Sequence, residues 1–386
     1  MISKVFALVL LLASPAFGQD VARIVYLGLD GDPYYEPQAV YTGLSLRDRK
    51  RPLDGVRLGF RDTRVLGRAL GVKFELTERL IAEEETVAGV LRDVLDGEPL
   101  AVLIDLPRDA MAEAIATAQP QDTLINIRDG ANHWRQEGCS PALLHSAPSD
   151  SMLTDALAQH LRGQSWPRVL LLHSDSERDL EIVEAVRRSA AKFGLRIVDE
   201  KNFELTNDPR RRDRNNIALL TGGPTHDVIW IVDDEGEFGR YVPFHTYAAR
   251  PVVGSEGLSP RAWHWTFERY GAPQLNQRFR RIAERDMTSE DWAAWVAVRS
   301  VVDAVTSVRS ADRAAVSAAL RSQDLSIDLY KGVRGNFRDW NGQLRQPILL
   351  ATHNAVISVA PLQGFEHRTD TLDTLGWDRP ESTCQF

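Results

Sequence analysis

The chain has 386 residues, of which 43% are hydrophobic and 26% charged, and its formal net charge at pH 7 is −8. These fractions are typical of globular proteins and exclude disordered and collagen-like chains, while the length allows two domains. The acidic balance disfavours a protein that coats nucleic acid, and two cysteines are too few for a four-cysteine zinc site.

Residues 1–18 have the composition of a cleavable secretory signal. Lys4 is their single charge, residues 5–13 are apolar, and Ala16 and Gly18 are small residues at the −3 and −1 positions. A buried amino-terminal strand or helix is the alternative interpretation. We therefore predict a periplasmic protein, and no later stretch approaches 18 uninterrupted apolar residues that would span a membrane.

Strands and helices alternate through the first part of the mature chain. The pattern predicts strands over 23–29, 56–62 (weakly), 72–76, 100–106 and 123–127, and helices over 83–95 and 109–117. Nearly all-apolar strands that alternate with amphipathic helices are typical of a parallel sheet covered on both faces. The first part of the chain therefore predicts one α/β lobe.

A second round of the same alternation begins at Ser149, a predicted N-cap. It comprises helices over 152–162 and 180–193, the latter closed by Gly194, and strands over 168–173, from 196 onward, 227–232 and 251–254. Residues 289–308 predict a core helix, and residues 348–352 and 355–359 predict a hairpin. Two α/β lobes with a helical and hairpin tail are the predicted architecture.

Candidate ligand-binding residues follow the strands, because open parallel sheets bind ligands beyond the carboxyl ends of their strands. They are Asp30, Asp32, Asp105, Asp129, Asp233, Glu235 and Glu256, with Asn126 and Arg128 among them and Tyr34 and Tyr35 able to stack on a ligand. Each aspartate can equally be a backbone cap. The carboxylates favour a cation, an amine or a metal complex, whereas Arg128 and the tyrosines favour an organic anion.

No arrangement of residues predicts catalysis or a bound cofactor. The glycine-rich turn at 221–224 lacks the end of a phosphate-binding loop, no His-Glu-x-x-His pair is present, and Ser255 is not flanked as in a nucleophile elbow. The basic run at 210–214 is typical of a solvated loop. We therefore predict a protein that is not an enzyme.

The order of elements resembles a type I periplasmic binding protein of the branched-chain amino-acid-binding branch, which feeds ABC transporters. Residues 139–149 (CSPALLHSAPS) resemble that branch's passage into its second lobe, and residues 252–257 (VVGSEG) resemble the segment that carries an acidic contact to the ligand ammonium, here Glu256. Further strings resemble a subfamily associated with alcohol dehydrogenase systems that depend on pyrroloquinoline quinone (PQQ). They are AWHW at 262–265, NQRFRR at 276–281, GQLRQPILLAT at 342–352 and LDTLGWDRPES at 372–382.

The resemblance implies two lobes joined by a hinge, with a small ligand between them. Residues 19–147 and 266–336 would form the amino-terminal lobe, and residues 148–265 and 337–386 the carboxyl-terminal lobe. The implied partner is an ABC transporter permease, and we expect a monomer. The strand ends at 105–107 and 126–129 lack the hydroxyl donors with which the family holds an α-carboxylate, so an α-amino acid is disfavoured.

Two alternatives stay open at this point. One is a periplasmic chaperone that delivers lanthanide, calcium or PQQ to a quinoprotein dehydrogenase, and the other is a sensor or interaction protein with a degenerate cleft. Export also gives the cysteines a meaning, because an oxidising compartment favours disulfides. Cys139 and Cys384 are the only pair, and we predict that they are bridged.

Overall fold

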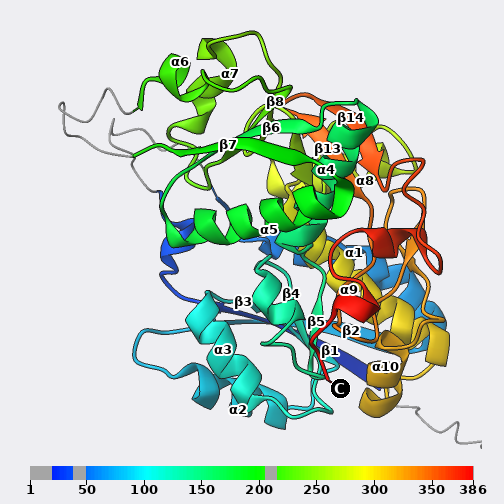
Figure 1. Ribbon diagram of the computed structural model, residues 1–386. Coiled ribbons are helices and arrows are strands. Elements are labelled where there is room, and N and C mark those ends of the chain that lie inside the picture. Colours follow the sequence, from blue (N-terminus) through cyan, green and yellow to red (C-terminus); the bar gives the residue numbers. More distant parts are fainter. Residues whose placement is uncertain (1–19, 38–48, 205–214, 386) are drawn as a thin grey trace, which may run out of the picture.

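The computed structural model describes residues 20–37, 49–204 and 215–385. The predicted leader at 1–18 and the basic run at 210–214 lie outside these residues. Figure 1 shows two α/β lobes, one above the other, as the sequence predicts. In the described part of the chain, no helix has the length and apolar character needed to cross a bilayer.

The first lobe is built on a five-stranded parallel sheet in the order β2-β1-β3-β4-β5. Its strands are β1 (Asp20–Leu29), β2 (Val72–Ile81), β3 (Ala101–Asp105), β4 (Leu124–Asn126) and β5 (Leu143–His145). Strand β3 is fully buried because helices cover both faces of the sheet. Strand β2 lies at one edge of the sheet.

Successive residues of β1 enter different cores, as expected for a strand with a two-residue period. Ile24 and Tyr26 pack in a core shared with α1 (Leu53–Leu70), α8 (Ala272–Ala283), α9 (Ser289–Val308) and α10 (Arg313–Leu320). Val25 and Leu27 pack on the opposite face with α2 (Val87–Asp96) and α3 (Arg108–Thr117). The helix predicted over 289–308 is confirmed, with the same bounds.

The weak strand predicted over 56–62 is wrong, because these residues lie within α1. Apolar and arginine residues alternate here, which is a pattern typical of a strand. In the structure these residues are helical, and glycines lie on the buried side of the helix. A Cβ on Gly59 would lie 2.8 Å from the Cβ of Val298 in α9, and one on Gly55 would lie 2.1 Å from the carbonyl oxygen of Asp291. The glycines let α1 approach α9 closely. Because they occupy buried positions where apolar side chains would normally recur, the sequence lacks the helical periodicity of apolar residues.

The second lobe contains a four-stranded parallel sheet in the order β7-β6-β8-β9. Its strands are β6 (Arg168–His173), β7 (Arg196–Asn202), β8 (Val228–Val232) and β9 (Val252–Gly254), and its long helices are α4 (Asp150–Gly163) and α5 (Glu177–Phe193). The Ser149 side chain accepts from the amide of Met152, which confirms the predicted cap of α4. Gly194 closes α5 in the left-handed conformation, also as predicted.

Smaller elements complete this lobe and the first one. The short helices α6 (Ile217–Leu220) and α7 (Val242–His245) stand at one end of the second lobe (Figure 1). The predicted hairpin is confirmed as β13 (Ile348–Thr352) and β14 (Ala355–Ala360), and β10 (Ser259–Arg261) joins it in an antiparallel sheet. A two-stranded ribbon is formed by β11 (Ile327–Asp328) and β12 (Arg334–Gly335).

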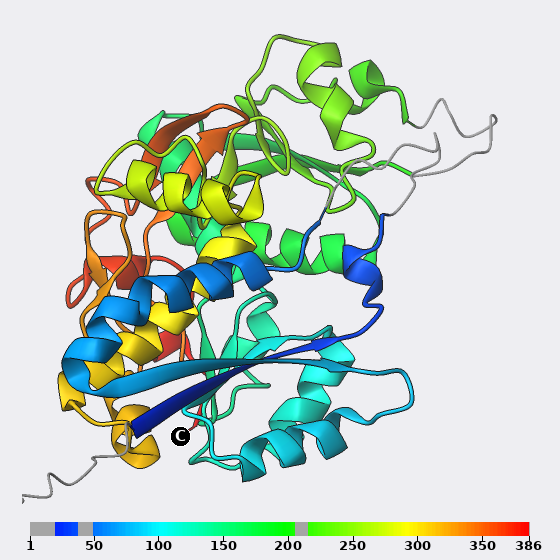
Figure 2. The same ribbon diagram turned by 180° about the vertical axis from the view of Figure 1, so that it is seen from behind.

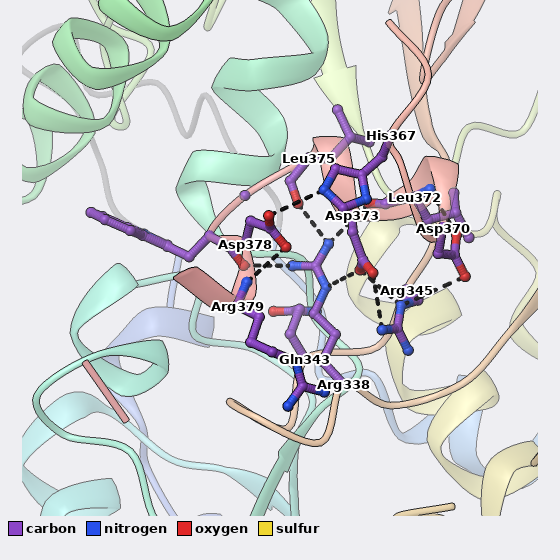
Figure 3. Close-up of polar contacts among 12 residues, drawn as sticks. Arg338, Gln343, Arg345, His367, Asp370, Leu372, Asp373, Leu375, Asp378 and Arg379 are labelled. Atoms are coloured by element: carbon purple, nitrogen blue, oxygen red, sulfur yellow. Dashed lines mark hydrogen bonds and ion pairs between the residues drawn. The ribbon is translucent and has the colours of Figure 1, made fainter. Parts of the chain in front are cut away.

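The carboxyl-terminal tail is held by a buried pair of arginines (Figure 3). The carboxylate of Asp373, in the short helix η5 (Thr371–Thr374), accepts from Nε of Arg338 at 2.8 Å and from Nε and Nη2 of Arg345 at 2.8 and 3.0 Å. Arg338 also donates to the carbonyls of Leu372 and Leu375. Burial of these charges is tolerated because each is paired and hydrogen-bonded.

The same tail touches both lobes. Lys192 of α5 donates to the carbonyl of Gly376, while farther along the amide of Thr383 donates to the side chain of Gln136 in the first lobe. The predicted disulfide between Cys139 and Cys384 is confirmed, with 5.9 Å between the two Cα atoms. The tail therefore links the second lobe to the first in addition to the main-chain segments that run between the lobes.

Candidate ligand-binding site

The turn after β1 presents two tyrosines at the carboxyl edge of the first sheet. Asp32 caps the short helix η1 (Pro33–Tyr35), where its carboxylate accepts from the amide of Tyr34 at 3.0 Å. Pro33 favours this turn because its φ is already fixed near the helical value. The rings of Tyr34 and Tyr35 meet edge to face with their centroids 5.0 Å apart.

Asp105, at the end of β3, lies at the centre of this edge. It is fully buried, and its carboxylate accepts from the hydroxyl of Tyr35 at 2.6 Å and from the hydroxyl of Tyr26. Nη1 of Arg128 lies 2.6 Å from Asp32 and 3.3 Å from Asp105. Burial alone would lower the pKa of Arg128, but Asp105 and Asp32 raise it above the usual arginine value. Both carboxylates therefore share one internal guanidinium as their ion-pair partner.

Three arginines lie against the tyrosine rings. The guanidinium carbon of Arg128 is 4.4 Å from the ring centre of Tyr34, and that of Arg49 is 4.5 Å from the same ring. Arg51 lies 4.8 Å from the ring centre of Tyr35. Burial, followed by the negative charge of Glu290, raises the pKa of Tyr34 to about 12, so its hydroxyl stays neutral. We call Asp32, Tyr34, Tyr35, Asp105 and Arg128, with Arg49 and Arg51, the tyrosine–arginine cluster.

One donor of this cluster is poorly satisfied. Nη1 of Arg51 is buried and makes no hydrogen bond of ordinary geometry with the described residues, while the guanidinium lies beside the Tyr26 hydroxyl and opposes the rise in pKa of that tyrosine. A Cβ placed on Gly28 would lie 3.0 Å from this atom, so the glycine makes room for the guanidinium. An unsatisfied buried donor costs about 1–3 kcal/mol, more for a charged group, so an acceptor supplied by a ligand would be stabilising.

Asn126 and Asp129 hold the loop that carries Arg128. The Asn126 oxygen accepts from the amides of Arg128 and Asp129 at 3.1 and 2.9 Å. Asp129 accepts from the amide of Ala131 and from the indole of Trp134. The pKa of Asp129 is lowered, because these hydrogen bonds and nearby arginines outweigh the effect of its burial. Asn126 and Asp129 thus stabilise the loop after β4 through hydrogen bonds within that loop.

In the second lobe, Asp233 organises the loop after β8. Its buried carboxylate accepts from the amides of Gly236, Phe238 and Gly239 at 2.6–3.0 Å. Glu256 is half-buried beside it, with its Cγ 3.1 Å from a Cβ placed on Gly239. The cluster and the Asp233 loop lie on facing lobes, because Nη2 of Arg49 contacts the Asp234 carboxylate at 3.1 Å.

The remaining predicted residues lie at the periphery. Asp30 is exposed and accepts from the neighbouring amide of Gly31, and Glu235 is also exposed. Among the described residues, no group of three or more histidine, cysteine, aspartate or glutamate side chains could hold a metal ion. The acidic lining expected from the strand ends is thus replaced by carboxylates that arginines and backbone amides already engage.

Some residues at this site were not predicted from the sequence. Arg49, Arg51 and Tyr26 carry no recognisable motif, and only the fold brings them to Tyr34 and Asp105. Another ion pair between the lobes joins Arg108 of α3 to Glu181 of α5 through both carboxylate oxygens. Glu181 is also 3.4 Å from Arg178, which pairs with Asp150 at the start of α4. These residues are far apart in the sequence, so the network can be recognised only from the three-dimensional arrangement of the two lobes.

Comparison with known proteins agrees with this architecture. Residues 137–222 match the family model described as the receptor family ligand binding region. No curated protein matches the sequence of the chain. The chain spans nearly the full length of many solved structures.

Three of these solved structures are components of ABC transporters, and each differs widely from this chain in sequence. A branched chain amino acid periplasmic ligand-binding protein from Burkholderia xenovorans has 14% identity and a TM-score of 0.67, over 88% of this chain and 95% of that one. A substrate-binding protein from Desulfitobacterium hafniense, in complex with Leu, has 16% identity and a TM-score of 0.65, over 87% and 99%. A solute binding protein from R. palustris, in complex with benzoate, has 10% identity and a TM-score of 0.63, over 95% and 100%.

The chain therefore has the fold of the type I periplasmic binding proteins: two α/β lobes whose mainly parallel sheets are flanked by helices. The predicted fold class is confirmed. The limits predicted for the two lobes are not tested by these comparisons and stay a prediction.

Proposed function

We propose that the protein is a periplasmic receptor for a small solute, without enzymatic activity, that works with the permease of an ABC-type transport system. The observation that carries the proposal is the tyrosine–arginine cluster. It lies at the carboxyl ends of β1, β3 and β4, where this fold places ligands, and it faces the second lobe through Arg49 and Asp234. The solved structures of similar fold are solute-binding proteins of ABC transporters, and this supports a role in transport.

The chemistry of the cluster favours an organic acid. Nη1 of Arg51 is a buried donor that makes no hydrogen bond of ordinary geometry with the residues that the structure describes, and a carboxylate would be its best acceptor because charge-assisted hydrogen bonds are strong. The rings of Tyr34 and Tyr35 supply apolar faces for the body of such a ligand. Glu256, on the facing lobe, would contact an ammonium group if the acid carried one. Two proteins of similar fold were solved in complex with a small carboxylate, one with Leu and the other with benzoate.

The lobes would close around this ligand. Arg49–Asp234 and Arg108–Glu181 join the two lobes, and such pairs can add to the stability of the closed form. A ligand favours closure only by the difference between its affinities for the two forms. Export by a leader at 1–18, a monomeric state and an association with PQQ-dependent alcohol oxidation are further parts of the proposal.

A thermal-shift screen tests the proposal. Aliphatic and aromatic carboxylates, amino acids, PQQ, calcium and a lanthanide are each added to the purified protein. The true ligand stabilises the folded state by about 2.7 kcal/mol at a hundredfold excess over Kd, which appears as a rise in Tm. A clear shift with a metal ion, and none with any organic acid, would contradict the proposal.

A substitution separates amino acids from simple acids. Glu256→Gln should weaken the binding of an amino acid at least tenfold in calorimetric titration, because the ammonium loses its counter-charge, and should leave a simple carboxylate unaffected. Glu268→Gln is the matched control, because Glu268 is exposed. Equal affinity of both variants for an amino acid ligand would remove Glu256 from the site.

A further inference from the structure

A basic groove lies on the outer flank of the first lobe, away from the tyrosine–arginine cluster. It is formed by helix α1 and the edge strand β2. These two elements lie side by side and are drawn in blue and lighter blue in Figure 2. The groove encloses about 600 Å³, which is within the range of small-molecule sites. Its lining comes from α1, from β2 and from Ile282 of α8.

The floor of the groove is apolar. Phe60 of α1, Phe74 and Leu76 of β2 and Ile282 of α8 are partly buried and pack on the core of the lobe. Gly67 lets the helix come down onto the strand, because a Cβ there would lie 2.7 Å from the carbonyl oxygen of Val72. The close contact fixes the floor and leaves the longer side chains of α1 at the rim.

The rim of the groove is strongly cationic in a chain whose net charge is negative. Two of its cations are paired: Arg57 donates to both carboxylate oxygens of Glu78 at 2.8 Å, and Lys73 lies 2.6 Å from Glu75. Arg61, Arg64 and Arg68 are exposed and have no ion pair within the described parts of the chain.

These three arginines repel one another. They are spaced by three and four residues, so they share one face of α1 and extend about 10 Å along its axis. Like charges at this spacing destabilise a helix, and an anion bound between them would relieve the repulsion. The arrangement costs stability in the free protein and gains from an anionic occupant.

We propose that this groove is a second binding site, for an organic polyacid with an apolar body and two or more carboxylates. The carboxylates would pair with Arg61, Arg64 and Arg68, and the apolar body would lie on Phe60, Phe74 and Leu76. Because the groove shares no residue with the tyrosine–arginine cluster, the site is independent of the proposed transport function.

Calorimetric titration with benzene-1,3,5-tricarboxylate tests this site. The wild-type protein should bind it, less tightly as salt is raised, because the arginines are exposed. The double variant R61Q/R64Q should lose at least tenfold in affinity. Its matched control is R92Q/R162Q, which removes two exposed arginines outside the groove. Citrate, which has carboxylates but no apolar body, should bind more weakly than the aromatic acid.

The outcomes are decisive in both directions. Because Arg61 and Arg64 are exposed and make no ion pair in the described structure, R61Q/R64Q should have a Tm equal to that of the wild type or slightly above it, since two like charges are removed. A loss of binding would therefore locate the ligand in the groove. No binding by the wild-type protein at millimolar tricarboxylate would overturn the proposal, as would equal binding by both double variants. Citrate binding as tight as the aromatic acid would overturn the role of the apolar floor.

Discussion

At the residue scale, the candidate site depends on how one buried carboxylate is satisfied by hydrogen bonds. Asp105 has no contact with solvent, yet it accepts from two tyrosine hydroxyls and lies beside the Arg128 guanidinium. Such a group is tolerated only when every oxygen is engaged, since an unpaired buried charge is very costly. The hydroxyl of Tyr35 therefore links the fold of the lobe to the surface on which a ligand would rest.

Substitution of Tyr35 measures this link. Tyr35→Phe removes the 2.6 Å hydrogen bond to Asp105 and should lower the free energy of unfolding by about 1–3 kcal/mol, because a buried carboxylate oxygen loses a donor. Urea unfolding followed by circular dichroism gives this value. Tyr247→Phe is the control, because Tyr247 is 75% exposed, and it should change stability by less than about 0.5 kcal/mol. Equal effects of the two variants would contradict the role of Tyr35.

The same residues show how far a candidate site can be read from a sequence. The strand ends predicted Asp32, Asp105, Arg128 and both tyrosines, and the structure brings them together. The sequence shows which carboxylates lie near the edge of the sheet, but it does not show which cation pairs with each of them. That depends on side-chain direction after folding, as in Arg128, which reaches back across the edge to Asp32.

At the element scale, α1 connects the core of the first lobe to the basic groove. Its glycines face α9 and β2, and its arginines face solvent and the groove. The glycines explain why the helix was missed in part: helices are recognised from the period of their apolar side chains, and a contact made by glycine backbone has none. Helix α9 buries the large side chains of Trp292 and Trp295, and it was predicted with the correct bounds.

Gly67→Ala tests the close contact of α1 with β2. The added methyl group would lie 2.7 Å from the carbonyl oxygen of Val72, so the helix must shift, and we expect a loss of about 1–3 kcal/mol in the free energy of unfolding. Gly163→Ala is the matched control in α4, because a Cβ there meets no atom within 4 Å. It should be neutral or slightly stabilising. Chemical denaturation of both variants decides, and a Gly67→Ala variant as stable as the control would refute the contact.

At the scale of the whole molecule, the two lobes are joined by ion pairs across their facing sides. Arg108→Gln removes the two-pronged pair with Glu181 and should shift the population toward a more open form, by up to about fivefold for a pair worth up to 1 kcal/mol. The radius of gyration from small-angle X-ray scattering should rise in the absence of ligand and return when ligand is added. Arg168→Gln is the control, since it breaks a similar pair with Asp227 inside the second lobe. An unchanged radius for Arg108→Gln would show that this pair does not influence closure.

The bridge between Cys139 and Cys384 also has a consequence for the biosynthesis of the protein. The two cysteines are 245 positions apart, so the bond can form only after the chain has been synthesised through residue 384. A polypeptide that stops short of residue 384 cannot attach its tail to the first lobe. A cell that exports the chain in unfolded form would therefore complete this bond last, on the side of the membrane where oxidants are available. Full-length material made in a reducing cytosol would lack the cross-link and would be the more easily digested from its carboxyl end.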